Sequence, residues 1–282
     1  MWFEDLNLIE NPFMDSENVE LVGYNGIVED LLYNIGASNI IVLEGKEGSG
    51  KTAILKAVTN KFKGNGKVVY INGTIVENPN IEKILINKYG FFGRVFNRMP
   101  RDMILLMDEV EKLSERNLER IKYFYDQNYI RSIIFTSSDK NRINFSPSLK
   151  DRVVKIITLK ELNDDEAYRI VKLRLGEIEL FSRDELKELF NESSRNIKKF
   201  LENCEAVARL TVERKLEKAS KEIMEEVLGK KEAKPKEQEK KAGKGKKGEK
   251  EKGKSKDIEI KSPEKKTEVK LPGQIKIIYD NN

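Results

Sequence analysis

Short apolar runs, many of them β-branched, alternate along the first 160 residues with segments whose apolar residues recur at helical spacing. Strands that alternate with helices are typical of a parallel sheet covered by helices on both faces. The runs show no polar alternation, which is typical of strands buried on both faces. We therefore predict a doubly wound, five-stranded parallel sheet of the α/β class. The strands are expected over residues 40–43, 67–72, 103–107, 132–136 and 153–159.

From residue 162 onward the strand-like runs cease and helical periodicity takes over. This change predicts an α/β domain over residues 1–160, followed by a small all-α lid domain over residues 161–228. Four helices are expected in the lid, over residues 164–175, 182–190, 196–210 and 216–228. The third has the clearest apolar face, formed by Ile197, Phe200, Leu201, Cys204, Val207 and Ala208.

The last part of the chain has a different composition. Residues 229–270 are dominated by Lys, Glu, Gly and Pro, which predicts a disordered basic linker, and residues 271–282 form a short apolar C-terminal peptide. From residue 229 to the end, 18 Lys stand against 10 Asp and Glu, a net +8, so the remainder carries 5 − 8 = −3. A flexible polycation attracts phosphate backbones, so the Lys-rich tail is a candidate DNA contact or a solubilising linker, and residues 271–280 are a candidate docking peptide for a protein partner.

Composition excludes several classes of site. The 282-residue chain has no His, so no imidazole serves as a base or a metal ligand, and its single Cys204 excludes an intrachain disulfide and a multi-cysteine metal site. Cys204 lies on an apolar helix face, which predicts a packing role. No apolar run approaches the roughly 20 residues of a membrane span. Residues 1–10 do not resemble a secretory signal, so we expect a cytoplasmic protein with no membrane partner.

The stretch between the first predicted strand and the following helix carries the clearest chemical signal. It fits the phosphate-binding pattern G-x-x-x-x-G-K-[ST] in the strand–loop–helix context that this pattern requires. Its glycines let backbone N–H groups converge on an anion, and the helix N-terminus adds positive potential. We therefore expect ATP and Mg²⁺ as cofactors, with Lys51 on the phosphates and the Thr52 hydroxyl on the metal. The cofactor-binding residues are Gly45, Lys46, Glu47, Gly48, Ser49, Gly50, Lys51 and Thr52.

The pair Asp108 and Glu109 ends the third predicted strand. One strand after a P-loop, such a pair is expected to complete the site: Asp108 holds the Mg²⁺ shell, and Glu109 polarises the attacking water. Successive strand residues point to opposite sides, which would give the two carboxylates separate roles. The alternative is a pair of acidic residues that caps a helix.

Phosphate cleavage also needs a polar group that fixes the water and a cation for the γ-phosphate. Ser138, just past the fourth strand, is the candidate polar group, with Thr136 as the alternative. Arg152, before the fifth strand, is the candidate cation from a neighbouring subunit, with Arg142 as a weaker alternative.

These residues carry a resemblance that covers roughly residues 10–228. The chain resembles AAA+ ATPases, especially the initiator ATPases of the origin-recognition class and the small subunits of sliding-clamp loaders. The P-loop and the Asp-Glu pair are common to all P-loop NTPases, whereas the helical lid and Arg152 point to AAA+ proteins. The matching segments are residues 22–28, 45–52, 69–72, 108–109, 135–138, 148–152 and 195–201.

The resemblance implies a sheet of order 5-1-4-3-2 and homo- or hetero-oligomers with other AAA+ subunits. It places Ser138 at the sensor-1 position, where Asn is more usual, and Arg152 at the position of a trans-acting arginine finger. Lys198 falls where the lid would place its sensor-2 Arg, and Arg195 is the alternative. A Lys cannot make the bidentate phosphate contact of an Arg.

The sequence after residue 228 resembles neither the winged helix of an initiator nor the collar of a clamp loader. Transposition helpers and secretion-associated ATPases of similar length are equally compatible. We therefore expect an ATP-binding and ATP-hydrolysing AAA+ switch that acts on DNA or a nucleoprotein complex in replication, recombination or transposition. The alternative is a nucleotide-gated scaffold with little hydrolysis that docks protein partners through its C-terminal tail. A small-molecule kinase is disfavoured, because no acceptor site is evident and the lid is long.

Overall fold

The structure is a computed structural model that describes residues 1–14, 21–62, 66–76, 78–88 and 99–229. The predictions for the Lys-rich linker beyond Gly229 and for the apolar peptide at 271–282 lie outside these residues.

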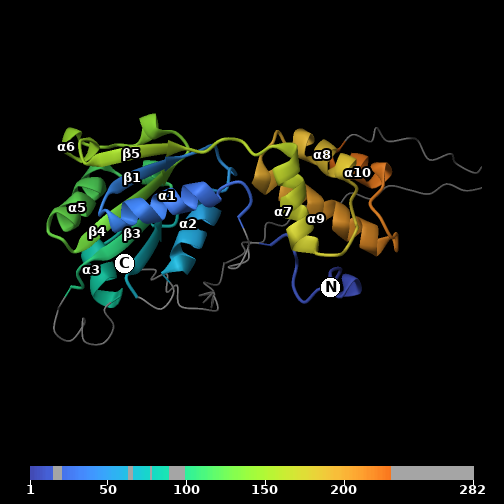
Figure 1. Ribbon diagram of the computed structural model, residues 1–282, viewed down its shortest axis with the longest axis horizontal. Helices are drawn as coiled ribbons and strands as arrows, with labels where there is room; N and C mark the ends of the chain where they lie inside the picture. Colours follow the sequence, from blue (N-terminus) through green and yellow to red (C-terminus); the bar gives the residue numbers. More distant parts are fainter. Residues whose placement is uncertain (15–20, 63–65, 77, 89–98, 230–282) are drawn as a thin grey trace, which may run out of the picture. The chain divides into compact units, whose positions relative to one another are not determined.

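Five parallel strands form one sheet in the order β2-β3-β4-β1-β5 (Figure 1). This is the predicted order 5-1-4-3-2 viewed from the opposite edge, so the predicted fold class is confirmed. All five strands run in the same direction, so their carboxyl ends meet at one edge, where ligands of open α/β sheets bind. The strands are β1 (Ile40–Glu44), β2 (Val68–Asn72), β3 (Met103–Asp108), β4 (Ile130–Ser137) and β5 (Val153–Thr158).

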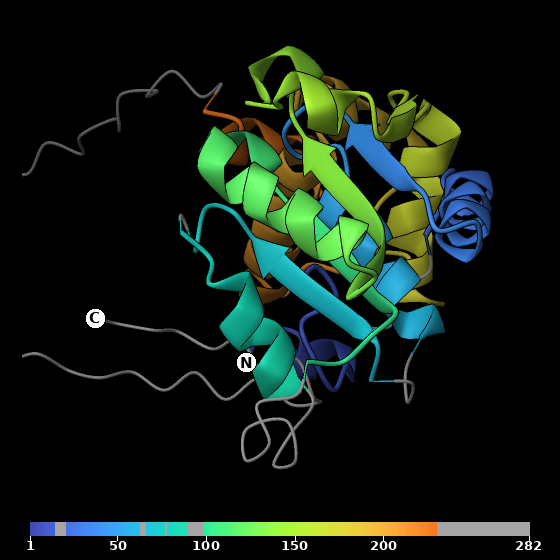
Figure 2. The same cartoon turned by 90° about the vertical axis from the view of Figure 1, so that its left-hand side faces the viewer.

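Helices cover both faces of the sheet, and alternate residues of one strand pack on opposite faces. In β1, Ile41 and Leu43 join the core beneath α1 (Asn25–Gly36) and α2 (Lys51–Lys61). Ile40 and Val42 join the core beneath α3 (Ile81–Lys88) and α5 (Glu115–Asp126) on the other face (Figure 2). The continuous apolar runs therefore reflect burial on two sides.

Strand β5 departs from this pattern. Among the described strands it pairs only with β1, at the edge of the sheet, and its residues Val154 and Ile156 are 64% and 46% exposed. Burial on both faces was predicted from its apolar run, and for this strand that prediction is wrong, because a sheet edge is covered less completely than its centre.

Four helices follow the sheet within residues 159–229, as the periodicity predicts. Both α7 (Asp164–Leu175) and α8 (Arg183–Glu192) begin with a capping box, from Asn163 to Glu166 and from Ser182 to Glu185. The longest is α9 (Ile197–Glu213), whose buried face includes Phe200 and Cys204. The last, α10 (Lys221–Val227), begins at its Ser220 cap rather than at 216.

The packing role predicted for Cys204 agrees with its position. The side chain is fully buried, and burial raises the pKa of its thiol well above the ordinary value. Such a thiol remains protonated and unreactive at neutral pH.

Short helical turns complete the described elements. None of the helices among the described residues combines the length and apolar character that crossing a membrane requires. The turns are η1 (Glu4–Leu6), η2 (Val110–Lys112), η3 (Lys140–Arg142) and α6 (Pro147–Lys150).

Phe200 anchors the helical part, since it is fully buried and its ring lies 5.2 Å from that of Phe190 on α8. We expect Phe200→Ala to lower the free energy of unfolding by about 3–5 kcal/mol, because it leaves a cavity in a packed core. The matched control is Tyr33→Ala, an aromatic residue that is 75% exposed, for which a change within about 0.5 kcal/mol is expected. Urea unfolding followed by circular dichroism measures both, and equal losses would contradict this assignment of the core.

Candidate functional site

The P-loop joins the end of β1 to the start of α2, as the sequence pattern requires. Gly48 and Gly50 adopt positive φ angles of 72° and 96°, which side-chain-bearing residues rarely adopt. A Cβ added at Gly48 would lie 2.1 Å from the amide oxygen of Asn196, so this glycine also permits a close approach of the lid.

Protein donors bond to the carbonyl oxygens of the loop. The N–H groups of Glu47, Gly48 and Gly50 have no acceptor among the described residues, which leaves them available to an anion. The carbonyl bonds are Lys51 Nζ to Gly45 O (2.6 Å) and Lys46 O (3.0 Å), Asn196 Nδ2 to Glu47 O (2.8 Å), Lys198 N to Gly48 O (3.3 Å) and Tyr24 Oη to Ser49 O (3.0 Å).

Lys51 is buried beneath the loop. Burial lowers the pKa of its ammonium group, and nearby carboxylates, led by Asp108 and Glu111, act in the opposite direction. The fold thus holds the Lys51 ammonium group against the P-loop, where a triphosphate would need a cation.

Asp108 lies at the carboxyl end of β3 and is almost completely buried. Its carboxylate accepts hydrogen bonds from Thr52 Oγ1 (2.7 Å), Tyr70 Oη (2.9 Å) and the hydroxyl of Thr136. Burial and then the charge of Asp108 raise the pKa of the Tyr70 hydroxyl, so Tyr70 donates as a neutral phenol. The structure therefore brings Thr52 and Asp108 together and connects them to β2 and β4.

Glu109 takes a different conformation from the one predicted. Strand β3 ends at Asp108, and Glu109 has left-handed backbone angles of φ 54° and ψ 50°. Because Glu109 lies outside the strand, the prediction that strand alternation separates the two carboxylates is wrong. The Glu109 carboxylate accepts the hydroxyl of Thr74, and its N–H donates to Thr136 Oγ1 (3.1 Å). It makes no capping hydrogen bond to η2, which disfavours the helix-cap alternative.

Ser138 and Thr136 have different partners, which separates the two alternatives for the polar group. Thr136 bonds to Asp108, whereas Ser138 bonds to Glu111 through its backbone N–H (2.9 Å) and its hydroxyl (2.6 Å). Burial acts to raise the pKa of Glu111, but hydrogen bonds from the Ser138 hydroxyl and from backbone N–H groups outweigh it and hold that pKa below its ordinary value.

The two arginines considered for a trans role lie on the surface. Arg152 is about half exposed, and its Nη2 lies 3.4 Å from Asp126 Oδ1 in a surface ion pair. Arg142 ends η3 and is exposed. Within this chain neither of them bonds to a P-loop residue among the contacts of the described residues.

The lid residues considered for the sensor-2 role differ in their contacts. The side chain of Lys198 is exposed, and only its backbone N–H reaches Gly48. Arg195 bonds to Asp164 Oδ1 (2.8 Å) and the Leu162 carbonyl oxygen (3.0 Å), and its guanidinium lies 4.7 Å from the Phe190 ring centroid. Arg195 thus ties the start of α9 to the start of α7.

Several residues of the site were not predicted from the sequence as site residues. Asn196, which precedes α9, and Tyr24, which precedes α1, both bond to the P-loop, and Tyr24 also donates to the Lys160 carbonyl oxygen (3.2 Å). Tyr70 lies on β2, the neighbour of β3, and its hydroxyl reaches Asp108, so the predicted strand order was the signal that could have identified it. No sequence pattern indicates a role for Glu111, since a further Glu in a charged loop is common.

The donor set fits a hard divalent cation. The Thr52 hydroxyl and the Asp108 carboxylate lie in contact beside the P-loop, and oxygen donors with a few ligands from a phosphate chain are what Mg²⁺ prefers. Within the described ranges, no group of three or more acidic, His or Cys side chains offers a separate metal site.

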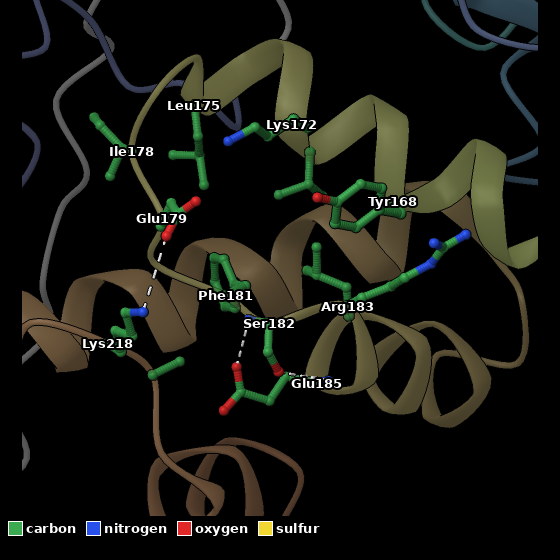
Figure 3. Close-up of a pocket in the computed structure, with 13 residues that line it drawn as sticks. Tyr168, Lys172, Leu175, Ile178, Glu179, Phe181, Ser182, Arg183, Glu185 and Lys218 are labelled. Carbon is green, nitrogen blue, oxygen red and sulfur yellow. Dashed lines mark hydrogen bonds and ion pairs between the residues drawn. The ribbon is translucent and has the colours of Figure 1, made fainter.

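A pocket on the helical part lies apart from this chemistry. Figure 3 shows Tyr168, Phe181 and Ser182 on its wall. Several of its polar groups contact one another: Lys218 Nζ lies 3.9 Å from Glu179 Oε2, Ser182 and Glu185 form the capping box of α8, and the Arg183 guanidinium lies 5.5 Å from the Tyr168 ring. None of the predicted site residues lines this pocket.

Comparisons with known proteins agree with the P-loop assignment. Residues 37–168 match the AAA_14 family model, an AAA domain. An uncharacterized HTH-type transcriptional regulator of Methanocaldococcus jannaschii is 25% identical over 192 residues, covering 64% of this chain and 44% of that protein. A probable ABC transporter ATP-binding protein, p29, of Mycoplasma pneumoniae is 28% identical over 170 residues, covering 58% of this chain and 64% of that protein. The chain thus spans less than two thirds of either relative.

Solved structures share the fold at low sequence identity. The ORC1 protein of Aeropyrum pernix, solved in complex with DNA, has a TM-score of 0.63 at 15% identity, covering 78% of this chain and 68% of that chain. Cdc6p of Pyrobaculum aerophilum also has a TM-score of 0.63, at 16% identity, covering 78% and 70%. The RuvB Holliday junction branch migration motor of Thermotoga maritima has a TM-score of 0.58 at 16% identity, covering 76% and 72%. Residues 37–168 thus match an AAA domain, and the chain has the fold of P-loop AAA+ ATPases and resembles those of the origin-recognition type.

Proposed function

We propose that this protein binds ATP with Mg²⁺ and hydrolyses it, and that it acts as a nucleotide-dependent switch on DNA or a nucleoprotein complex. The observation that carries the proposal is the contact between Thr52 and Asp108 beside a buried Lys51. A hydroxyl, a carboxylate and a cation meet there under a loop that presents free N–H groups, which is the arrangement a metal-bound triphosphate needs.

Each residue has a separate role in the proposed reaction. Lys51 and the loop N–H groups hold the β- and γ-phosphates, and Thr52 and Asp108 would hold Mg²⁺, which when bound neutralises phosphate charge. The Glu109 carboxylate first gives up its hydrogen bond with Thr74. It then orients a water molecule and accepts a proton from it. The water oxygen forms a bond to the γ-phosphorus as the bond to the ADP oxygen breaks, and the proton passes through Glu109 to solvent.

The contact between the lid and the P-loop supports a switch. The side chain of Asn196 and the backbone of Lys198 bond to the carbonyl oxygens of Glu47 and Gly48, at the first turn of α9. A nucleotide that reorients the P-loop therefore changes the contacts at the start of α9. Nucleotide binding and release are in this way coupled to the position of the lid.

The proposed action on DNA rests on the similar proteins and on charge. Structures of similar fold include one solved with DNA and one described as a Holliday junction motor. The net charge of +8 from residue 229 onward would attract a phosphate backbone. The competing proposal, a nucleotide-gated scaffold that docks partners through residues 271–280, predicts tight ATP binding with little turnover.

Substitutions at the site test hydrolysis. We expect Lys51→Ala to weaken ATP binding, and Glu109→Gln to bind ATP while turnover falls by about 100-fold or more, because only the second removes a group needed for proton transfer. Phosphate release with and without duplex DNA measures turnover, and a fluorescent ATP analogue measures binding. Lys61→Ala at the far end of α2 is the matched control and should match wild type. Equal turnover in all four proteins would contradict the proposed site.

The trans role proposed for Arg152 makes a complementation test available. Arg152→Ala alone should lose hydrolysis by about 100-fold or more if its guanidinium completes a neighbour's site. Mixing it with Lys51→Ala should restore part of the turnover, because the Lys51→Ala subunit still supplies Arg152 to a neighbour that binds ATP. The comparison is Arg142→Ala, measured alone and mixed with Lys51→Ala in the same way. Normal hydrolysis by Arg152→Ala, or no recovery on mixing, would rule out a trans role for this residue.

A further inference from the structure

We infer that Glu111 is a positioning residue of the ATPase site, which holds the Ser138 hydroxyl in the orientation that accepts a hydrogen bond from the attacking water. This inference rests on the proposed function and adds a second carboxylate to it. Glu111 would act through Ser138, without itself touching the nucleotide.

Glu111 forms direct hydrogen bonds with Ser138, the residue that follows β4. The left-handed turn at Glu109 leads into η2, and this turn brings Glu111 back beside Ser138. One carboxylate oxygen, Oε1, accepts both the backbone N–H of Ser138 (2.9 Å) and its hydroxyl (2.6 Å). Two bonds to a single residue fix the position and the rotamer of that serine.

The direction of the hydroxyl bond decides what Ser138 can do. A serine hydroxyl has one proton to donate and two lone pairs that accept. Because Glu111 takes the proton, in a charge-assisted bond, the remaining capacity of the Ser138 oxygen is to accept. An acceptor at this position suits a water O–H, whereas it would repel the oxygens of the γ-phosphate.

The second oxygen of Glu111 is poorly satisfied. Oε2 is buried and forms no hydrogen bond of ordinary geometry in the described structure, although the Ser137 hydroxyl and the Glu111 N–H also act on the carboxylate. A buried carboxylate oxygen without a well-formed hydrogen bond destabilises a fold, so stability alone does not account for a charge at this position. The charge of Glu111 also raises the pKa of Lys51, against the effect of burial.

The test compares Glu111→Leu, Glu111→Gln, Ser138→Ala and the double variant Glu111→Leu/Ser138→Ala with wild type. The glutamine variant keeps a carbonyl oxygen that accepts both bonds from Ser138. The matched control is Glu119→Leu, because Glu119 also accepts the hydroxyls of two serines, Ser146 and Ser148, away from the P-loop. Phosphate release at saturating and limiting Mg·ATP gives kcat and KM, and thermal unfolding gives Tm for every variant.

We expect Glu111→Leu and Ser138→Ala each to lower kcat by about tenfold or more while KM for ATP stays within about twofold, because a water-positioning contact matters in the transition state and not in binding. The double variant should be no slower than the slower single variant, since both substitutions remove one unit. Glu111→Gln should recover most of the kcat that Glu111→Leu loses. Glu119→Leu should keep the kcat of wild type, and the Tm of every variant should lie above the assay temperature, so that a loss of kcat does not reflect unfolding.

The outcomes separate the inference from the function on which it rests. A wild-type protein that releases no more phosphate than Lys51→Ala removes the proposed ATPase and, with it, the role of Glu111. If wild type hydrolyses ATP and Glu111→Leu hydrolyses it at the same rate, only the inference is overturned. The inference is also overturned if the double variant loses the product of the two single losses in kcat. It is overturned as well if the variants raise KM and leave kcat unchanged.

Discussion

The candidate site depends on the hydrogen bonds that the carboxylate of Asp108 accepts. Three hydroxyls reach it from three elements: Thr52 from α2, Tyr70 from β2 and Thr136 from β4. A buried carboxylate is costly unless it is satisfied by hydrogen bonds, and these three donors satisfy it. They also fix the distance between the P-loop helix and the sheet edge, so the same bonds that stabilise the charge position the proposed metal ligands.

Parallel strand order explains how these groups come to the same place. Asn72 lies opposite Asp108 in the ladder between β2 and β3, and Leu43 lies opposite Thr136 in the ladder between β4 and β1. Chain segments far apart in sequence therefore end at one edge, beside the loop after β1. The lid adds a second constraint, because Asn196 contacts the P-loop where only a glycine at position 48 leaves room.

The sequence was sufficient to predict the strands and the lid helices, and it indicated where the candidate site lies. The apolar runs predicted every strand, and the P-loop with its flanking strand and helix predicted where Lys51 and Thr52 lie. The resemblance supplied the strand order, which periodicity alone does not determine.

What could not be predicted depends on turns and partners. The left-handed turn at Glu109 has no glycine to indicate it, so the orientation of Glu109 and the return of Glu111 to Ser138 were not foreseen. Likewise, the partners of Arg195 on α7 and the exposure of β5 at the sheet edge follow from tertiary contacts. Local patterns carry little information about such contacts.

The most direct test of the account is a crystal structure of the protein with Mg²⁺ and a non-hydrolysable ATP analogue. The account predicts the metal between the Thr52 hydroxyl and the carboxylate of Asp108, with the β- and γ-phosphates on Lys51 and the loop N–H groups. A triphosphate bound elsewhere, or a metal whose ligands include neither Thr52 nor Asp108, would contradict it.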